Sequence, residues 1–347
     1  MKNKERILFI GGINFGKNPR GGVDAKNQIM LKRLQEDPNI EIDHLDASKY
    51  RHSLILSAIQ MIINLFRYDR FMFSLSDRAL QNIAYLNFIL KKKRVTIFVV
   101  GGRLYERLGH KQLNNFMKDA CKVYVETETH KKLFLQSCPQ ANLKVFPNFK
   151  VIPQNIKFEE KAPAKEVKLL YLASIRETKG IFRCIDIIEK LNQANDGREY
   201  KLSIYGGFKL TDEERKSFDK SVKESKYLSY DGFLDFNDDA SYEVLAKHHI
   251  MLFLTNFPGE GFPGVLIDAM IAGLPVVASD WRYNAEILDT EKGQLAKIID
   301  LNGDYVNDSC QAVRDILSDE NKYIQLRKDM QAETIKYDVN KIKFDIC

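Results

Sequence analysis

The sequence predicts an α/β fold with two doubly wound, Rossmann-like domains that face each other, and three observations support this class. Short apolar runs alternate with helix-length amphipathic segments, which is typical of parallel sheets covered by helices. A segment without periodicity divides the chain near its middle, and 347 residues suffice for two hydrophobic cores. Ligands of open sheets bind beyond the carboxyl ends of the strands, so we expect the site in the cleft that the domains share.

Strand and helix signals alternate from one end of the chain to the other. The strands expected in the first half are 6–11, 40–45, 71–75, 94–100, 122–126 and 143–146. Helices are expected to follow Gly22, Ser53, Asp77, Lys111 and Glu128. The strands expected in the second half are 168–173, 201–205, 228–230, 250–255 and 275–279. Between the halves, VIPQNIKFEEKAPAK (151–165) carries two prolines and mixed charge, which indicates an interdomain linker.

Composition and cysteine usage favour a cytoplasmic globular protein. Hydrophobic residues make up 44% of the chain and charged residues 29%, which matches ordinary globular domains. The first residues lead straight into a strand without a signal-peptide pattern. Five cysteines without a Cys-x-x-Cys pair predict free thiols in a reducing compartment. The basic residues are not interleaved with aromatic residues, so we expect no nucleic-acid partner.

The longest apolar run, SLILSAIQMIINLF at 53–66, has 14 residues and is too short to span a bilayer. Basic residues flank it, and a second basic cluster, KKKR, follows at 91–94. With a net charge of +6, this region predicts peripheral contact with an anionic membrane at its inner face. A buried helix beside a solvated charge run is the alternative interpretation.

Residues 256–286 carry the strongest functional signal. A strand ends here, and a glycine-rich turn at 259–264 leads into a helix that we expect from Pro263 to Ala272. Gly273 then stops the helix. The free N–H groups at the start of this helix favour an anion. Two carboxylates, Glu260 in the turn and Asp268 on the helix, suit the hydroxyls of a nucleotide sugar.

The same turn also matches a dinucleotide fingerprint. Gly259, Gly261 and Gly264 have the G-x-G-x-x-G spacing, and Asp280 ends the next strand at the expected distance. An NAD-dependent oxidoreductase is therefore an alternative. Two features count against it, because the motif lies in the second half of the chain and Glu260 would bring negative charge beside the pyrophosphate.

The segment EGFPGVLID resembles the donor-binding motif of the retaining GT-B glycosyltransferases of family four, the group 1 type. The family signature is two glutamates separated by seven residues, and Asp268 replaces the second one. The following AGLPVVASDWRYNAEIL continues the family pattern up to Glu286. The upstream LLYLASIRETKGI resembles the first strand and loop of the nucleotide domain, with Lys179 at the position of the diphosphate lysine.

The first half carries weaker parts of the resemblance. KVFPNFK resembles the segment that closes the first domain, with Asn148 in the asparagine position, and Gly21-Gly22-Val23 resembles the glycine-rich loop. Two positions depart from the family. Ser174 stands where an arginine is common, with Arg176 out of register, and VVGGRLYERL lacks the histidine found in many members.

The resemblance implies the transfer of a sugar from a nucleotide-diphosphate sugar with retained anomeric configuration. We expect the nucleotide of the donor to be UDP. The implied acceptor is a glycan or polyprenyl-linked oligosaccharide in bacterial surface polysaccharide or capsule biosynthesis. Glu260 and Lys179 are the implied catalytic residues. The implied donor-binding residues are Asp268, Gly261, Phe262, Pro263, Gly264, Val265, Arg176 and Gly22.

Gly102, Arg103 and Glu106 are the residues that we expect on the acceptor side, although a solvated helix start explains Arg103 and Glu106 equally well. We expect no cofactor beyond the donor substrate, and no metal, because the chain has no Asp-x-Asp motif. A nucleotide-sugar epimerase of GT-B-like fold and a non-catalytic sugar-nucleotide-binding protein remain alternatives.

The sequence also predicts domain bounds. Residues 1–154 form the acceptor-binding domain, 155–165 the linker and 166–330 the nucleotide-sugar domain. Residues 331–347 are expected to form a C-terminal helix that returns to the first domain, because YDVNKIKFDIC resembles the final helix of the family.

Overall fold

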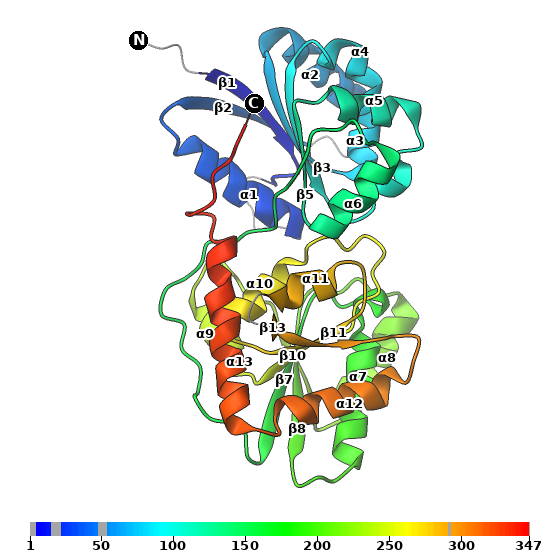
Figure 1. The fold of residues 1–347 in the computed structure, drawn as a ribbon. Helices are drawn as coiled ribbons and strands as arrows, with labels where there is room; N and C mark the ends of the chain where they lie inside the picture. The colour runs from blue at the N-terminus through cyan, green and yellow to red at the C-terminus, as the bar shows by residue number, and fades with distance from the viewer. Residues whose placement is uncertain (1–4, 15–21, 48–53, 291–292, 347) are drawn as a thin grey trace. The chain divides into compact units, whose positions relative to one another are not determined.

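The computed structural model describes residues 5–14, 22–47, 54–290 and 293–346 (Figure 1). The chain forms two compact units. Unit 1 comprises Met1–Val151, Gly259–Gly264 and Tyr337–Cys347, and unit 2 comprises Ile152–Pro258 and Val265–Lys336. Of the positions that the sequence singled out, Gly21, Arg51, His52, Ser53 and Cys347 lie outside the described residues.

Unit 1 contains a parallel sheet with the strand order β2-β1-β3-β4-β5-β6. Its strands are β1 (Glu5–Gly11), β2 (Ile40–Asp46), β3 (Arg70–Ser76), β4 (Arg94–Val100), β5 (Lys122–Val125) and β6 (Leu143–Val145). Its helices are α1 (Gly22–Gln35), α2 (Leu54–Arg67), α3 (Asp77–Ile83), η1 (Ala84–Leu86), α4 (Asn87–Leu90), η2 (Leu104–Arg107), α5 (Lys111–Asp119) and α6 (Glu128–Ser137).

Both faces of this sheet are buried along its central strands, because successive strand side chains point to opposite faces and most of those in β3 and β4 are buried. Leu8 and Phe73 pack on the side of α2 to α6, whereas Ile7 and Phe9 pack on the side of α1. Figure 1 shows the sheet between α1 and the other helices of the unit.

Unit 2 contains a second parallel sheet, with the order β14-β11-β10-β7-β8-β9. Its strands are β7 (Glu166–Leu172), β8 (Glu199–Tyr205), β9 (Leu228–Gly232), β10 (Ile250–Phe253), β11 (Val276–Ser279) and β14 (Ala296–Ile299), besides the small hairpin β12 (Asp289–Thr290) and β13 (Gly293–Gln294). Its helices are η3 (Glu177–Lys179), α7 (Ile181–Gln193), α8 (Asp212–Glu224), α9 (Ala240–Ala246), α10 (Gly264–Ile271), α11 (Asn284–Leu288), α12 (Tyr305–Ile316), α13 (Glu320–Glu333) and η4 (Thr334–Tyr337).

Each sheet has a point where the strand order reverses. In unit 1 the reversal lies between β1 and β3, and in unit 2 it lies between β7 and β10. Loops that leave neighbouring strands at such a point diverge and expose a crevice, which is where open α/β sheets bind ligands. In unit 2 a ligand site is therefore expected at the segments that follow β7 and β10.

The predicted fold class, with two doubly wound parallel sheets, is confirmed. The helix expected at 263–272 is α10, which ends two residues before Gly273, a residue in the left-handed region at φ 62°. The edge strand β14 is absent from the sequence-based expectation.

The expected C-terminal helix is wrong for the last residues. Helix α13 and the short η4 end at Tyr337, and residues 338–346 form no helix. Ile342, Phe344 and Ile346 pack on the core of unit 1. Apolar residues at every second position suit an extended chain rather than a helix, which explains the difference.

No helix in the described ranges has both the length and the apolar character that crossing a membrane requires.

Candidate functional site

Lys179 is the last residue of η3, in the loop between β7 and helix α7, and Gly180 separates it from the helix. The local sequence explains its position. Gly180 caps the helix with φ 85°. A Cβ atom there would lie 2.3 Å from the Leu254 carbonyl oxygen, so only glycine allows the two loops to approach this closely. Lys179 is therefore held against the loop that follows β10, at the reversal point of the unit 2 sheet.

The two loops are also joined by hydrogen bonds. The Asn256 N–H donates to the Thr178 carbonyl over 2.9 Å, and the Arg183 guanidinium donates to the Leu254 carbonyl over 3.2 Å. Backbone groups that bond each other in this way leave little freedom between the loops. They form one rigid platform at the carboxyl ends of β7 and β10.

Phe257 lies at the centre of this platform and contacts two cations. The Arg176 guanidinium carbon is 5.1 Å from the ring centroid, and the Lys179 Nζ is 4.9 Å from it. The Trp281 indole N–H donates to the Phe257 carbonyl over 2.8 Å. Two half-buried positive charges at a strand-order reversal suit an anionic ligand.

Asp268, the second acid of the motif, is buried on α10 with 1% of its surface exposed. The Tyr242 hydroxyl donates to its Oδ1 over 3.0 Å. Burial, together with the Asp268 carboxylate, raises the pKa of the Tyr242 hydroxyl, so the donor stays protonated. Val265 begins the part of α10 that belongs to unit 2.

Glu260 belongs to the segment Gly259–Gly264, which is part of unit 1. Its side chain is buried to 6% exposure. A Cβ atom on the next residue, Gly261, would lie 2.5 Å from Glu126 Oε2 and 3.0 Å from the Gly101 Cα, so this position requires glycine. The predicted donor-binding glycine thus fits against two parts of unit 1.

A buried ion pair holds this segment. Glu126 Oε2 accepts a hydrogen bond from the Phe262 N–H over 3.0 Å, and its Oε1 lies 2.7 Å from Lys26 Nζ. Both charged side chains are nearly fully buried, at 3% and 4% exposure. The Phe262 carbonyl accepts from the Asn148 side chain over 3.0 Å, so both backbone groups of Phe262 are fixed. The backbone two residues after Glu260 is therefore rigidly held.

Lys150 lies beside the start of helix α10. Its Nζ is 3.8 Å, and the Asn148 Nδ2 3.5 Å, from the point where a Gly264 Cβ would stand. Pro263, whose ring is buried, is the residue immediately before the helix. A cation at this position adds to the positive potential of the helix N-terminus.

A profile of the family described as Glycosyl transferases group 1 matches residues 153–336, which is more than half of the chain. This chain belongs to the group 1 glycosyl transferases. The profile spans Lys179 and the Glu260 segment. No curated protein sequence matches the chain significantly.

Solved structures of glycosyltransferases share the fold of this group 1 glycosyltransferase. HepE from Anabaena, in complex with UDP and glucose, is 16% identical with a TM-score of 0.67, covering 97% of this chain and 96% of its own. Sucrose-phosphate synthase from Thermosynechococcus elongatus is 14% identical with a TM-score of 0.67, covering 96% and 95%. The lipopolysaccharide outer core galactosyltransferase WaaB, in its apo form, is 14% identical with a TM-score of 0.64, covering 96% and 98%. The fold is therefore of the GT-B type.

The remaining predicted residues of this glycosyltransferase lie in unit 1. Arg103 Nε donates to Glu106 Oε2 over 2.7 Å, so these two side chains pair with each other. Gly102 is buried beside Gly101, and a Cβ on Gly101 would lie 3.6 Å from the Gly259 carbonyl oxygen. Gly22 begins α1 after the β1 loop, with open space where a Cβ would stand. The role of each remains a prediction.

Sequence reasoning missed several residues that shape the glycosyltransferase site, namely Lys26, Glu126, Lys150 and Phe257. None of them carries a local pattern. Lys26 and Glu126 are separated by 100 residues, and only the sheet brings them together.

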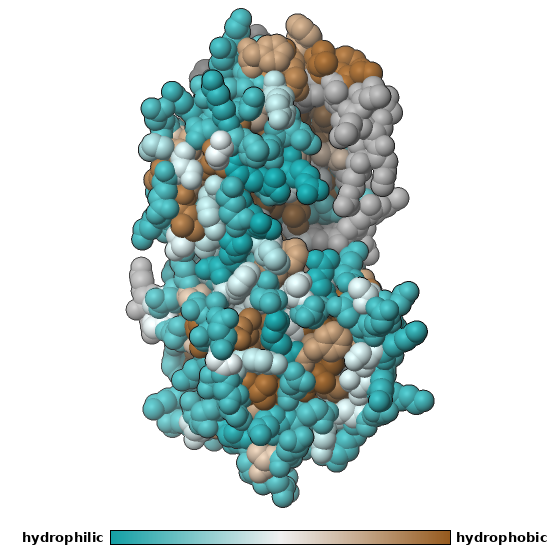
Figure 2. All heavy atoms as spheres, turned by 90° about the vertical axis from the view of Figure 1, so that its right-hand side faces the viewer, coloured by the Kyte–Doolittle hydropathy of each residue, from teal (hydrophilic) through white to brown (hydrophobic). Residues whose placement is uncertain are grey.

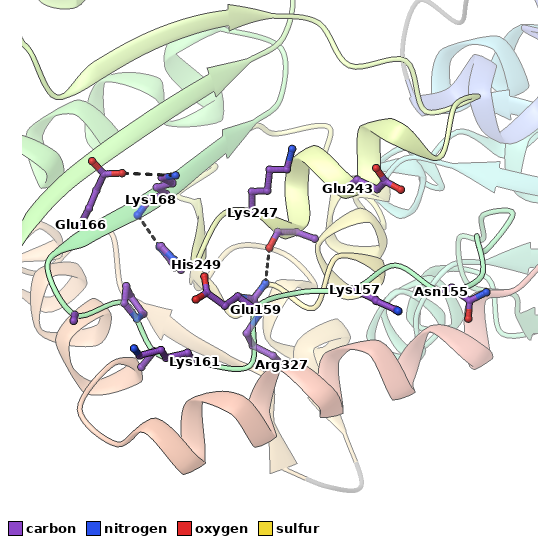
Figure 3. A pocket seen from close by; sticks show the side chains of 14 residues that line it. Asn155, Lys157, Glu159, Lys161, Glu166, Lys168, Glu243, Lys247, His249 and Arg327 are labelled. Carbon is purple, nitrogen blue, oxygen red and sulfur yellow. Dashed lines mark hydrogen bonds and ion pairs between the residues drawn. The ribbon is translucent and has the colours of Figure 1, made fainter.

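A pocket of about 650 Å³ lies at the opposite edge of the unit 2 sheet (Figure 3). Glu166 and Lys168 at the start of β7, His249 just before β10, the 155–164 segment and Arg327 of α13 line it. Ligands of open sheets bind at the carboxyl ends of the strands, whereas this pocket is at their amino ends. It includes none of the residues predicted for the donor.

Arg327 explains why this pocket is rigid. Its guanidinium is buried and donates to the carbonyls of Gly273 and Ala246 and to the Tyr323 hydroxyl. These bonds join the C-terminal ends of α9 and α10 to α13, which is a structural role. Among the described residues no group of three or more His, Cys, Asp or Glu side chains could hold a metal ion.

Proposed function

We propose that this protein is a retaining glycosyltransferase that transfers a sugar from a UDP-sugar to a glycan or a polyprenyl-linked oligosaccharide. The observation that carries the proposal is the pair of cations, Arg176 and Lys179, on the Phe257 ring at the β7–β10 reversal. A departing nucleoside diphosphate carries the negative charge that such a pair stabilises. The UDP in the HepE structure supports the choice of base.

The proposed roles follow from charge. When the bond to the donor sugar breaks, negative charge grows on the diphosphate and positive charge grows at the anomeric carbon. Lys179 stabilises the diphosphate, and the N–H groups at the start of α10 add to it. Glu260 accepts hydrogen bonds from donor-sugar hydroxyls, and the fixed backbone at Phe262 maintains its position.

Asp268 has the proposed role of binding the ribose. The Tyr242 hydroxyl, which donates to its Oδ1, holds the carboxylate in place, and the carboxylate is the group proposed to accept from a ribose hydroxyl. Retention suggests a same-face reaction in which the leaving phosphate draws off the acceptor proton, so no metal and no base histidine is required.

The test is a panel of UDP-, GDP- and ADP-sugars incubated with the protein and a polyprenyl-linked acceptor. We expect one UDP-sugar to be consumed, and NMR of the product to show the donor's anomeric configuration. An inverted product would contradict the retaining mechanism. Epimerised donor without transfer would favour the epimerase, and binding without any reaction would favour a sugar-nucleotide-binding protein. Consumption of NAD alone would favour the oxidoreductase.

We also propose that unit 1 contacts an anionic membrane surface through α2 and α4, as an acceptor anchored in a membrane requires. Phe66 on α2 is 80% exposed and Phe88 on α4 is 65% exposed, and Ile62 and Ile63 are close to half exposed. Figure 2 shows hydrophobic side chains gathered on this face of unit 1. Exposed basic residues lie at the ends of the two helices, because Arg67 is the last residue of α2, and Lys91 and Lys92 follow α4. Apolar residues beside basic ones suit the headgroup region of an anionic bilayer.

Vesicle flotation tests this contact. We expect binding to vesicles with 30% phosphatidylglycerol, but not to pure phosphatidylcholine, and we expect Phe66→Ser to weaken it several-fold. Phe233→Ser is the matched control, because Phe233 is 74% exposed in unit 2. Equal flotation of both variants, or no flotation of the natural protein, would remove the proposal.

A further inference from the structure

Phe257 is a half-buried aromatic residue with a positively charged group on each of two neighbouring side chains. Arg176 and Lys179 both lie within 6 Å of its ring centroid, the range in which the negative face of an aromatic ring attracts a cation. The Phe257 ring thus attracts Arg176 and Lys179 to the same place.

The ring itself has a fixed position. The Phe257 N–H donates to the Thr255 hydroxyl over 3.1 Å, and its carbonyl accepts from the Trp281 indole over 2.8 Å. The preceding residue, Asn256, donates its N–H to Thr178 in the loop of Lys179. Because both backbone groups are occupied and the neighbouring loop is bonded to it, Phe257 can act as a rigid support.

Two like charges on one ring repel each other, and this cost has to be offset. Both cations are only half-buried, so water screens the repulsion in part. A ligand with two negatively charged groups offsets the remaining repulsion, because it attracts both cations. The arrangement therefore favours a diphosphate over a singly charged ligand.

We propose that Phe257 is a positioning residue that holds Arg176 beside Lys179, so that Arg176 supplies the second diphosphate cation in this chain. Ser174 occupies the position where related glycosyltransferases commonly carry an arginine, and the cation comes instead from two residues further along. The inference rests on the proposed function, since it assumes a nucleoside diphosphate at this site.

Calorimetry with UDP, and with uridine as the comparator, tests the proposal. We expect Arg176→Gln to weaken UDP binding about tenfold. Phe257→Leu keeps the bulk but removes the aromatic face, and we expect a two- to five-fold loss. Phe257→Tyr keeps the aromatic face and should bind UDP with the affinity of the natural protein. Uridine affinity should stay the same in every variant, because uridine has no phosphate.

A double-mutant cycle separates positioning from general disturbance. In the Arg176→Gln background, Phe257→Leu should cost less than it does alone, because one of the two cations that it positions is gone. Arg215→Gln is the matched control, since Arg215 also lies over a ring, 3.6 Å from the Phe208 centroid, at a different part of unit 2. This control loses the same charge and should bind UDP normally.

The outcomes distinguish the positioning role of Phe257 from the proposed function of the protein. If Lys179→Gln weakens UDP binding while Arg176→Gln and Phe257→Leu leave it unchanged, the positioning role is overturned and the proposed function stands. If the natural protein binds none of UDP, GDP and ADP, both are overturned. A loss of uridine affinity in Phe257→Leu equal to its loss of UDP affinity would also overturn the positioning role, because the defect would then not concern the phosphates.

Discussion

Phe149 in unit 1 and Phe257 in unit 2 both carry cations on their rings, and their surroundings differ. In unit 1, Lys26 Nζ lies 5.6 Å from the Phe149 centroid and is paired with Glu126. In unit 2, Phe257 supports Arg176 and Lys179, which are two charges of the same sign. The first cluster is sealed from solvent, whereas the second is half open.

The difference indicates different tasks. A buried ion pair with all its partners in place has no further ligand to bind, and its effect is to fix the backbone that it touches. Here that backbone is Phe262, next to the segment of Glu260. Two half-buried charges of the same sign on one ring are instead suited to attract an anion. The cluster of Lys26 and Glu126 fixes the backbone at Phe262, whereas the cluster on Phe257 is suited to bind an anion.

The largest expected effect tests the sealed cluster. Replacing Glu126 with alanine leaves the Lys26 ammonium buried without a partner and should lower the free energy of unfolding by about 3–5 kcal/mol. Urea denaturation measures it. The double variant Lys26→Met with Glu126→Leu should recover most of this stability, because apolar residues of similar size replace a buried pair well.

The same double variant sharpens the comparison. It removes the acceptor of the Phe262 N–H, so we expect turnover to stay low although stability returns. Recovery of both stability and turnover would show that the pair contributes to folding alone.

The next effect concerns the segment that the cluster holds. Glu260→Ala should lower turnover about a hundred- to a thousandfold, which corresponds to about 2.7–4 kcal/mol of transition-state stabilisation, with the fold intact. Steady-state kinetics and circular dichroism measure the two quantities. Glu41→Ala removes an exposed acid of unit 1 and serves as the control. Near-normal turnover of Glu260→Ala would contradict the proposed role of Glu260 in binding the donor sugar.

A smaller effect is expected at the contact between the segment and Glu126. The added methyl group of Gly261→Ala would lie 2.5 Å from Glu126 Oε2, so the segment has to shift, at a cost of about 1–3 kcal/mol. Turnover should fall with it. The control is Gly109→Ala, because a Cβ there has open space. Equal behaviour of the two variants would contradict the close fit.

The smallest effect lies away from both clusters, at His249. Burial and the Arg327 charge lower the pKa of His249 to about 4, while its Nδ1 accepts from the Lys168 N–H over 2.8 Å. The unfolded chain binds this proton near pH 6.5, so stability is full above pH 6.5 and falls by roughly 1–2 kcal/mol between pH 6.5 and 5.

Replacing His249 with asparagine keeps an acceptor near the Nδ1 position but removes the titration. Thermal unfolding of this variant across pH 4–7 should lose less stability on acidification than the natural protein does. An identical pH profile of the two proteins would exclude His249 as the source.

Most strands could be predicted from the sequence, for a physical reason. Strands buried on both faces are continuous apolar runs, so β4 and β10 stand out between charged helices. The edge strand β14 has four residues and an exposed Lys297, which weakens that signal. The C-terminal tail was assigned to a helix by resemblance, although its alternating Ile342, Phe344 and Ile346 indicate an extended chain.

The site was only partly predictable, because its supporting contacts are not local. The motif around Glu260 and the motif around Lys179 can each be recognised in a single stretch of sequence. In contrast, Phe257 meets Arg176 only after β7 and β10 pair, and Glu126 meets Lys26 only across the first sheet. Arg176, which is out of register in sequence, reaches the ring of Phe257 because the loop after β7 turns back at η3.

The path of the chain through unit 1 has a consequence for biosynthesis. Phe344 packs on Phe146 and Phe149, and Lys122 and Lys144 both bind Asp345. These partners are made early on the ribosome, whereas residues 338–346 emerge only after unit 2 has been made. Domains tend to fold as their residues emerge, yet unit 1 lacks part of its packing until this segment has been synthesised. Nascent chains arrested before residue 337 should therefore hold an unfinished first unit, and a premature stop shortly before residue 342 would harm the part of the protein that was synthesised first.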